Sequence, residues 1–171
     1  PVGEPIQGSA VPVVSIVVPT YREAENLPPL CEAVHQVMMQ SDFADYELIV
    51  VDDLSPDETV SVARKLSETY PLRLLQPEGR PRDLSLSVLD GIEASAAEIV
   101  VVMDADLSHP ISLIPELMRL ASEGGMVVGS RYVAGGQFDR GWSFWRFLNS
   151  FLATRLAAPL TTCRDPMSGF F

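Results

Sequence analysis

Short runs of apolar, largely β-branched residues recur along the chain and alternate with longer segments of helical periodicity. Each run has the length of one strand that is buried on both faces. The runs cover residues 13–18, 46–51, 72–75, 99–103 and 126–128. This pattern predicts five strands in the interior of the molecule.

The segments between the runs carry apolar residues three and four positions apart, which predicts amphipathic helices. Asn26 is a candidate cap for the first helix, the SPDE sequence at 55–58 has a capping-box pattern, and Asp83 can cap the third helix. Gly124 and Gly125 are expected to end the fourth helix. Strands that alternate with such helices predict βαβ units, and hence an α/β fold with a mostly parallel sheet.

Charged or aromatic residues follow four of the five runs. They are Tyr21 and Glu23, Asp52 and Asp53, Asp104 and Asp106, and Arg131. The carboxyl ends of parallel strands open on one edge of the sheet, where α/β proteins bind their ligands. We therefore expect these residues to meet at one acidic crevice.

The triplet Asp104-Ala105-Asp106 is the main candidate for metal chemistry. Aspartates two positions apart in an extended segment point the same way, so both can reach one divalent cation that also holds a phosphate. The same triplet is common in solvated turns, so the assignment depends on its place at a strand end. Neighbouring carboxylates repel by about 1 kcal/mol in water and roughly 4 kcal/mol near a protein surface, and a cation would offset this repulsion.

Two other ways of binding phosphate are absent from the sequence. No GxGxxG pattern follows the first run, and GxxxxGK[ST] does not occur. A phosphate at this crevice would therefore be held by a metal and by arginine rather than by a glycine-rich loop.

The composition, with 47% hydrophobic and 20% charged residues, is typical of a folded globular protein. The formal net charge of -11 argues against nucleic acid as a partner, because nucleic acids are bound by basic surfaces. Cys31 and Cys163 have neither metal nor redox spacing, so we expect inert thiols and a reducing, cytosolic setting. No apolar run approaches the length of about 18 residues that a membrane span needs.

Five motifs occur in an order that is similar to that of one enzyme family. They are PTYREAENL at 19–27, VDDLSPDET at 51–59, VVMDADLSHP at 101–110, GSRYVAGG at 129–136 and DPMSGFF at 165–171. Together they resemble glycosyltransferase family 2 of the GT-A fold, and within it the dolichol-phosphate mannose synthases and the bacterial polyprenyl-phosphate sugar transferases. The resemblance runs from about Ser15 to the last residue.

The resemblance implies a Rossmann-like, three-layer GT-A sandwich that transfers a sugar with inversion and needs Mg²⁺ or Mn²⁺. The implied donor is a nucleotide-sugar, with GDP-mannose favoured, and the implied acceptor is a polyprenyl phosphate of the dolichyl type. One alternative keeps the family but uses UDP-glucose or another donor and a sugar or glycan acceptor. Another alternative is a nucleotide-sugar-binding module without turnover.

The resemblance also implies which residues form the site. The nucleotide-sugar set is Pro19, Tyr21, Glu23, Val51, Asp52, Asp53, Asp104, Ala105 and Asp106. The metal set is Asp104, Asp106 and Ser108, and the acceptor-phosphate set is Arg131, Arg146 and Ser150. Asp104, Asp106 and Arg131 would be the catalytic residues.

The chain departs from the family pattern in three places. Leu54 stands where the family has the glycine of DDGS, and RPRDLSLS at 80–87 replaces a glycine-rich GLGxA stretch. A basic segment that follows SGF in the family is absent here. The first two departures affect the nucleotide end of the expected site.

Residues 1–12 are rich in proline and glycine and predict a flexible leader. We expect residues 13–171 to form the catalytic domain, truncated at its C-terminal end within a longer protein that has room for a membrane segment. The stretch 141–160 interleaves aromatic and basic residues, which suits either a membrane surface or a core. With a lipid acceptor, the expected location is peripheral, on the cytoplasmic face of a membrane.

Overall fold

The computed structural model describes residues 13–130 and 168–171. Within them, four strands form one sheet in the order β3-β2-β1-β4, and every neighbouring pair is parallel. The strands are β1 (Val14–Thr20), β2 (Tyr46–Asp52), β3 (Leu72–Leu75) and β4 (Ile99–Val102). Each begins and ends within two residues of a predicted run, which confirms four of the five expected strands.

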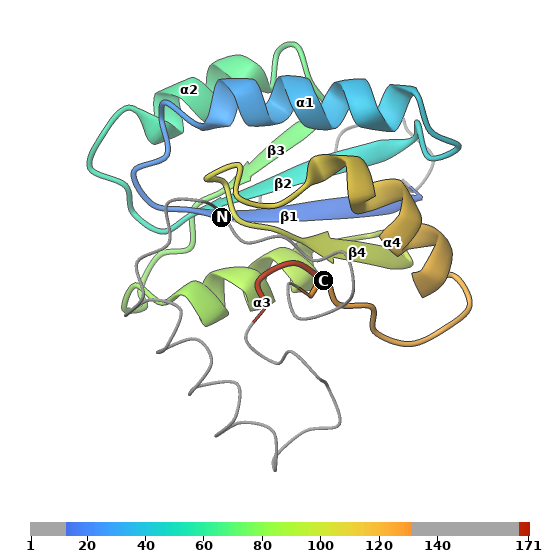
Figure 1. Ribbon diagram of the computed structural model, residues 1–171. Helices are drawn as coiled ribbons and strands as arrows, with labels where there is room; N and C mark the ends of the chain where they lie inside the picture. The colour runs from blue at the N-terminus through green and yellow to red at the C-terminus, as the bar shows by residue number, and fades with distance from the viewer. Residues whose placement is uncertain (1–12, 131–167) are drawn as a thin grey trace, which may run out of the picture.

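Helices cover both faces of this sheet. They are α1 (Leu27–Met39), α2 (Thr59–Leu66), α3 (Leu84–Ala94) and α4 (Ile114–Ala121), the last preceded by a short 3-10 turn, η1 (Ile111–Leu113). Figure 1 shows α1, α2 and α4 on one face of the sheet and α3 on the other. The predicted three-layer α/β sandwich with a parallel sheet is therefore confirmed.

Successive strand residues point to opposite faces of the sheet, so the strands contribute to two separate cores. The larger core lies under α1, α2 and α4 and includes Ile16, Leu48 and Met103. The smaller core lies under α3 and contains Val17, Ile49, Val51, Leu75 and Val102. Because all seven residues of β1 are buried, this strand forms the central wall of both cores.

The strand predicted at 126–128 is wrong, because residues 126–130 carry no strand in the structure. The edge of β4 where a fifth strand would pair is used by the C-terminal residue. Val102 N–H donates to the carbonyl of Phe171 at 2.6 Å, and Phe171 N–H donates to the carbonyl of Val102 at 3.2 Å. Met126 is 70% exposed, so the apolar run does not enter the core there.

The helix ends agree only in part with the predicted caps. Asp83 caps α3 as expected, since its carboxylate accepts the N–H of Leu86 at 3.0 Å. The capping box at 55–58 is wrong: α2 begins at Thr59, its N-cap residue Glu58 makes no side-chain cap bond, and the Thr59 N–H donates to the Asp57 carboxylate at 3.2 Å. Asn26 precedes α1, but its side chain donates to Glu23 instead of accepting a helix N–H.

Cys31 is fully buried in the larger core. Burial raises the pKa of its thiol from 9.0 to about 11, because the charged thiolate would lose its hydration. Since the thiolate is the reactive form, this cysteine matches the inert thiol that the sequence predicts. Cys163 lies outside the described residues, and so does the leader predicted at 1–12.

Candidate functional site

A cavity of about 380 Å³ opens where β1, β2 and β4 end. It is lined by Pro19, Thr20, Tyr21, Glu23, Asp53, Arg82, Asp83, Leu84, Ser87, Asp104, Ala105 and Asp106. Seven of these residues belong to the nucleotide-sugar set expected from the sequence. The parallel sheet thus brings together strand ends that lie far apart along the chain.

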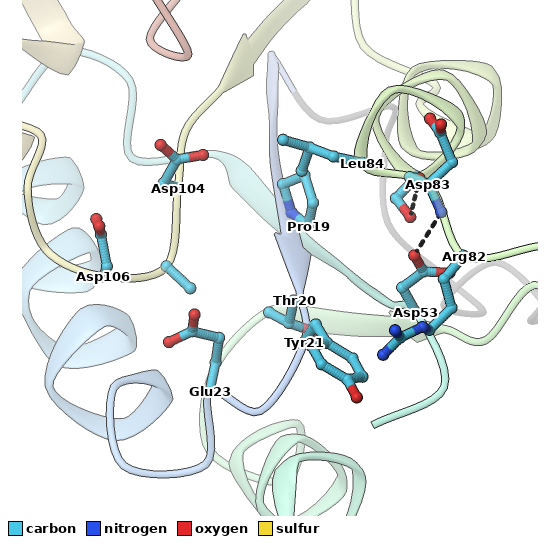
Figure 2. A pocket seen from close by; sticks show the side chains of 12 residues that line it. Pro19, Thr20, Tyr21, Glu23, Asp53, Arg82, Asp83, Leu84, Asp104 and Asp106 are labelled. Atoms are coloured by element: carbon cyan, nitrogen blue, oxygen red, sulfur yellow. Dashed lines mark hydrogen bonds between the residues drawn. The ribbon is translucent and has the colours of Figure 1, made fainter. Parts of the chain in front are cut away.

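The cavity has two distinct ends, which Figure 2 shows. Glu23, Asp104 and Asp106 lie together at one end, which we call the acidic end. Asp53, Arg82 and Asp83 lie at the other, which we call the loop end, and Pro19, Thr20 and Tyr21 lie between the two. A ligand that fills this cavity would therefore span from a pair of aspartates to a mixed-charge loop.

Hydrogen bonds to the start of α2 hold the turn after β1. Arg22, at φ +61°, donates its N–H to Ser55 Oγ at 3.0 Å, and Glu23 donates its N–H to Thr59 Oγ1 at 2.9 Å. The Thr59 hydroxyl in turn donates to Asp57, and this bond lowers the pKa of the Asp57 carboxyl below its usual value. Glu23 accepts from Asn26 at 2.7 Å, so its carboxylate is oriented where it borders the cavity.

Val51 and Asp52 are not among the residues that line the cavity, and their assignment to the nucleotide-sugar set stays a prediction. Both residues are fully buried. Val51 belongs to the core under α3, while Asp52 accepts hydrogen bonds from the side chain of Thr20 and from both the N–H and the hydroxyl of Ser55. Their side chains therefore stabilise the turn and the core from inside.

The chain leaves β4 with Asp104 and Asp106 separated by the buried Ala105. The Asp104 side chain is 45% exposed. His109 Nδ1 accepts the N–H of Asp104 at 3.3 Å, and its Nε2 lies 3.5 Å from Asp104 Oδ2. A neutral imidazole with its proton on Nε2 satisfies both contacts, so His109 supports the carboxylate from the protein side.

The end of the DPMSGFF motif packs against the same aspartate. A Cβ on Gly169 would lie 3.2 Å from Asp104 Oδ2, so the absence of a side chain leaves room for the carboxylate. Phe170 stacks on the His109 ring, with 5.1 Å between the ring centroids. His109, Gly169 and Phe170 lie within the quoted motifs but were not predicted as site residues, because their contacts join segments about 60 residues apart.

The described residues contain no group of three or more histidine, cysteine, aspartate or glutamate side chains that could hold a metal. Mg²⁺ is commonly bound by only one or two carboxylates, with water and substrate phosphates as the other ligands. Asp104 and Asp106 match that donor set, because both border the acidic end of the cavity. Ser108 does not line the cavity, and its N–H donates to Asp106 Oδ1 at 3.0 Å, so its backbone orients a proposed ligand.

The loop end of the cavity was only partly expected from the sequence. Residues 80–87 depart from the family pattern, and the structure places four of them in the cavity wall: Arg82, Asp83, Leu84 and Ser87. The Arg82 guanidinium carbon lies 4.1 Å from the centroid of the Tyr21 ring. The arginines of this loop were the sequence feature that could have indicated a binding role. Whether their side chains point into the cavity depends on how the loop folds.

Leu54 adopts φ +60°, a left-handed conformation that costs a residue with a Cβ about 1–2 kcal/mol. Its side chain is 47% exposed, so little packing offsets the strain. We expect Leu54→Gly to raise the free energy of unfolding by about 1 kcal/mol, after allowing for the extra freedom of glycine in the unfolded chain. Urea unfolding tests this, with Leu54→Ala as the control that keeps the strain; a less stable glycine variant would contradict it.

Several predicted site residues lie outside the described part of the chain. They are Arg131, Arg146 and Ser150, together with the aromatic and basic stretch 141–160. Their roles at the acceptor phosphate and the membrane surface stay predictions.

The family model described as glycosyl transferase family 2 matches residues 15–171, which is most of the chain. The chain belongs to glycosyl transferase family 2. The family expected from the sequence motifs is thereby confirmed.

Curated relatives share the name dolichol-phosphate mannosyltransferase. The protein of Pyrococcus furiosus is 39% identical over 163 residues, which cover 92% of this chain and 45% of the relative. The protein of Saccharomyces cerevisiae is 36% identical over 158 residues, which cover 92% of this chain and 59% of the relative. The chain thus spans about half the length of the curated relatives that it matches.

Solved structures of glycosyltransferases share the fold. A mannosyltransferase of Pyrobaculum calidifontis, in complex with GDP-Man and Mn²⁺, aligns with a TM-score of 0.52 at 28% identity, over 71% of this chain and 37% of its own. Glucosyl-3-phosphoglycerate synthase of Mycobacterium tuberculosis aligns with a TM-score of 0.59 at 23% identity, over 93% of this chain and 55% of its own. The second likeness concerns the fold alone.

Proposed function

We propose that this domain catalyses the inverting transfer of mannose from GDP-mannose to a polyprenyl phosphate of the dolichyl type, as part of a longer protein. The observation that carries the proposal is the cavity, which joins Asp104 and Asp106 to Tyr21 and Asp53 at the ends of three parallel strands. The identity to dolichol-phosphate mannosyltransferases over most of the chain supports the choice of donor and acceptor.

The two ends of the cavity suit the two halves of a nucleotide-sugar. At the acidic end, Asp104 and Asp106 would hold Mg²⁺ or Mn²⁺ beside the donor diphosphate, and the bound cation offsets the charge of the leaving group. The Mn²⁺ in the complex of the Pyrobaculum calidifontis mannosyltransferase supports this assignment. Tyr21, between the two ends, and Asp53, at the loop end, offer a ring and a carboxylate to the base and ribose.

The proposed acceptor needs no side-chain base. A phosphate monoester has a second pKa near 6, so at neutral pH its oxygen is already an anionic nucleophile. What the protein must add is positive charge that holds this anion beside an acidic cavity, and guanidinium groups do so through paired hydrogen bonds. We assign that role to Arg131 and Arg146, with Ser150 close by, and direct attack then inverts the anomeric centre.

A lipid acceptor places the proposed reaction at a membrane surface. No helix in the described part of the chain is long and apolar enough to cross a membrane. We propose that residues 141–160 rest on the cytoplasmic face, with tryptophan and arginine at the interface and the lipid tail in the bilayer.

An assay of GDP release tests the proposed function. The longer protein is incubated with GDP-mannose and Mn²⁺ in three arms: with dolichyl phosphate, with free sugars, and with no acceptor. We expect release to depend on the lipid phosphate and the product to have inverted configuration. Release that depends on a free sugar or glycan would favour another acceptor class, and binding without release in every arm would indicate a non-catalytic module.

A further inference from the structure

Arg80 connects the loop before α3 with the carboxylate at the loop end of the cavity. Its Nη1 donates to Asp53 Oδ1 at 3.3 Å. Its Nε and Nη2 donate to Asp90 Oδ2 at 3.0 and 2.6 Å, and Nη2 also donates to Ser87 Oγ at 3.1 Å. One guanidinium therefore joins the end of β2 to α3.

The bond between Arg80 and Asp53 is shielded from water. The side chains of Arg80 and Asp53 are 17% and 13% exposed, which removes much of the solvent screening that weakens surface ion pairs. The planar guanidinium presents five donors in fixed directions, so it can bind two carboxylates and a hydroxyl at once. A lysine ammonium at the same position has no such fork and would keep only part of this network.

The second oxygen of Asp53 is held as well. Asp83 N–H donates to Asp53 Oδ2 at 2.8 Å, which Figure 2 marks with a dashed line. Each carboxylate oxygen has two acceptor positions, so these two bonds fix the orientation of Asp53 and leave capacity for further donors. Asp53 also lines the cavity, where a ligand can supply such donors.

We infer that Arg80 is a positioning residue for the nucleoside half of the donor. It holds the Asp53 carboxylate so that its remaining acceptor positions receive N–H or O–H groups of the base and ribose. The inference rests on the proposed function, because it requires a nucleotide in the cavity. In this chain, side-chain bonds at 80–87 take the place of the glycine-rich loop in the family pattern.

Without Arg80, two effects act on the nucleoside half. Asp53 would lose one of its two fixing bonds and its ion-pair partner, which would leave Arg82 as the arginine that lines a cavity already made acidic by Glu23, Asp83, Asp104 and Asp106. The acidic end would change little, because the hydrogen bonds of Arg80 go to Asp53, Pro81, Ser87 and Asp90, which belong to the loop end and to α3.

Calorimetric titration of this chain with GDP, UDP and inorganic pyrophosphate, each with Mn²⁺, separates the two ends. We expect Arg80→Ala to weaken binding of GDP about 10-fold or more, because a charge-assisted hydrogen bond contributes about that much to affinity. Binding of pyrophosphate should be unchanged. Arg80→Lys should lie between the wild type and Arg80→Ala. Arg64→Ala is the matched control, because Arg64 bonds Gln76 at an exposed position away from the cavity.

A double-mutant cycle decides whether Arg80 acts through Asp53. We expect the loss caused by Arg80→Ala to shrink to less than threefold in an Asp53→Asn background. An equal loss in both backgrounds, or an equal loss for pyrophosphate, would overturn the positioning role, and urea unfolding of each variant checks that the fold persists. If the wild type binds neither GDP nor UDP, the proposed function fails along with the inference; if it binds GDP and Arg80→Ala binds equally well, only the inference fails.

Discussion

Asp104→Asn and Asp106→Asn are each expected to weaken Mn²⁺-dependent binding of GDP by about two orders of magnitude. A bound divalent cation contributes several kcal/mol to holding a phosphate, and the neutral amide removes half of the negative charge that the pair offers to the cation. Both side chains border the acidic end of the cavity, so their loss acts on the diphosphate directly. Titration calorimetry with and without Mn²⁺ measures the effect.

The matched control for this prediction is Glu116→Gln. Glu116 is an exposed carboxylate in the first turn of α4, so its replacement removes the same charge away from the cavity. We expect the control to bind GDP as the wild type does and all three variants to unfold at similar urea concentrations. Unchanged Mn²⁺-dependent binding in both aspartate variants would exclude a metal at this pair.

Gly91→Ala is expected to lower the free energy of unfolding by about 1–2 kcal/mol. A Cβ at this position would overlap Cγ1 of Val17 and lie 3.1 Å from Cγ2 of Val51, both on fully buried strands. Overpacking of a core costs typically 1–3 kcal/mol or more, which exceeds the roughly 1 kcal/mol that alanine gains over glycine in a helix. Urea or thermal unfolding measures the loss.

Two variants control for the helix itself and for the overlap. Ser85→Ala, at an exposed position of α3, should be neutral or slightly stabilising, because only the helix propensity changes there. Combining Gly91→Ala with Val17→Ala should cost less than the sum of the two single changes, since the smaller strand residue makes room for the new Cβ. Strict additivity would mean that α3 shifts away from the sheet instead of clashing with Val17.

The site was predictable where its residues follow strands directly. The apolar, β-branched composition of the runs predicts that they are buried strands, and the parallel topology places the residues after them at one edge of the sheet. These residues are Pro19, Tyr21, Glu23, Asp53 and the Asp104–Asp106 pair. Asp52 shows the limit of this argument. A strand residue and the residue after it point to opposite sides of the chain, so adjacent aspartates divide between the interior and the cavity.

The sequence by itself determined the positions of the four strands and the four helices, the parallel α/β arrangement and the aspartate pair after β4. These features depend on local periodicity and on the rule that parallel strand ends share one edge, so a single stretch of chain is enough to show them. The tertiary structure alone decided that residues 126–128 do not join the sheet, since Phe171 bonds the edge of β4. It also decided that Arg80 orients Asp53 and that Gly169 packs against Asp104. Each of these outcomes depends on a contact between two segments that are distant in the sequence. Local periodicity does not say which distant residue will pair with the edge of β4, with the Arg80 guanidinium or with the space beside Gly169.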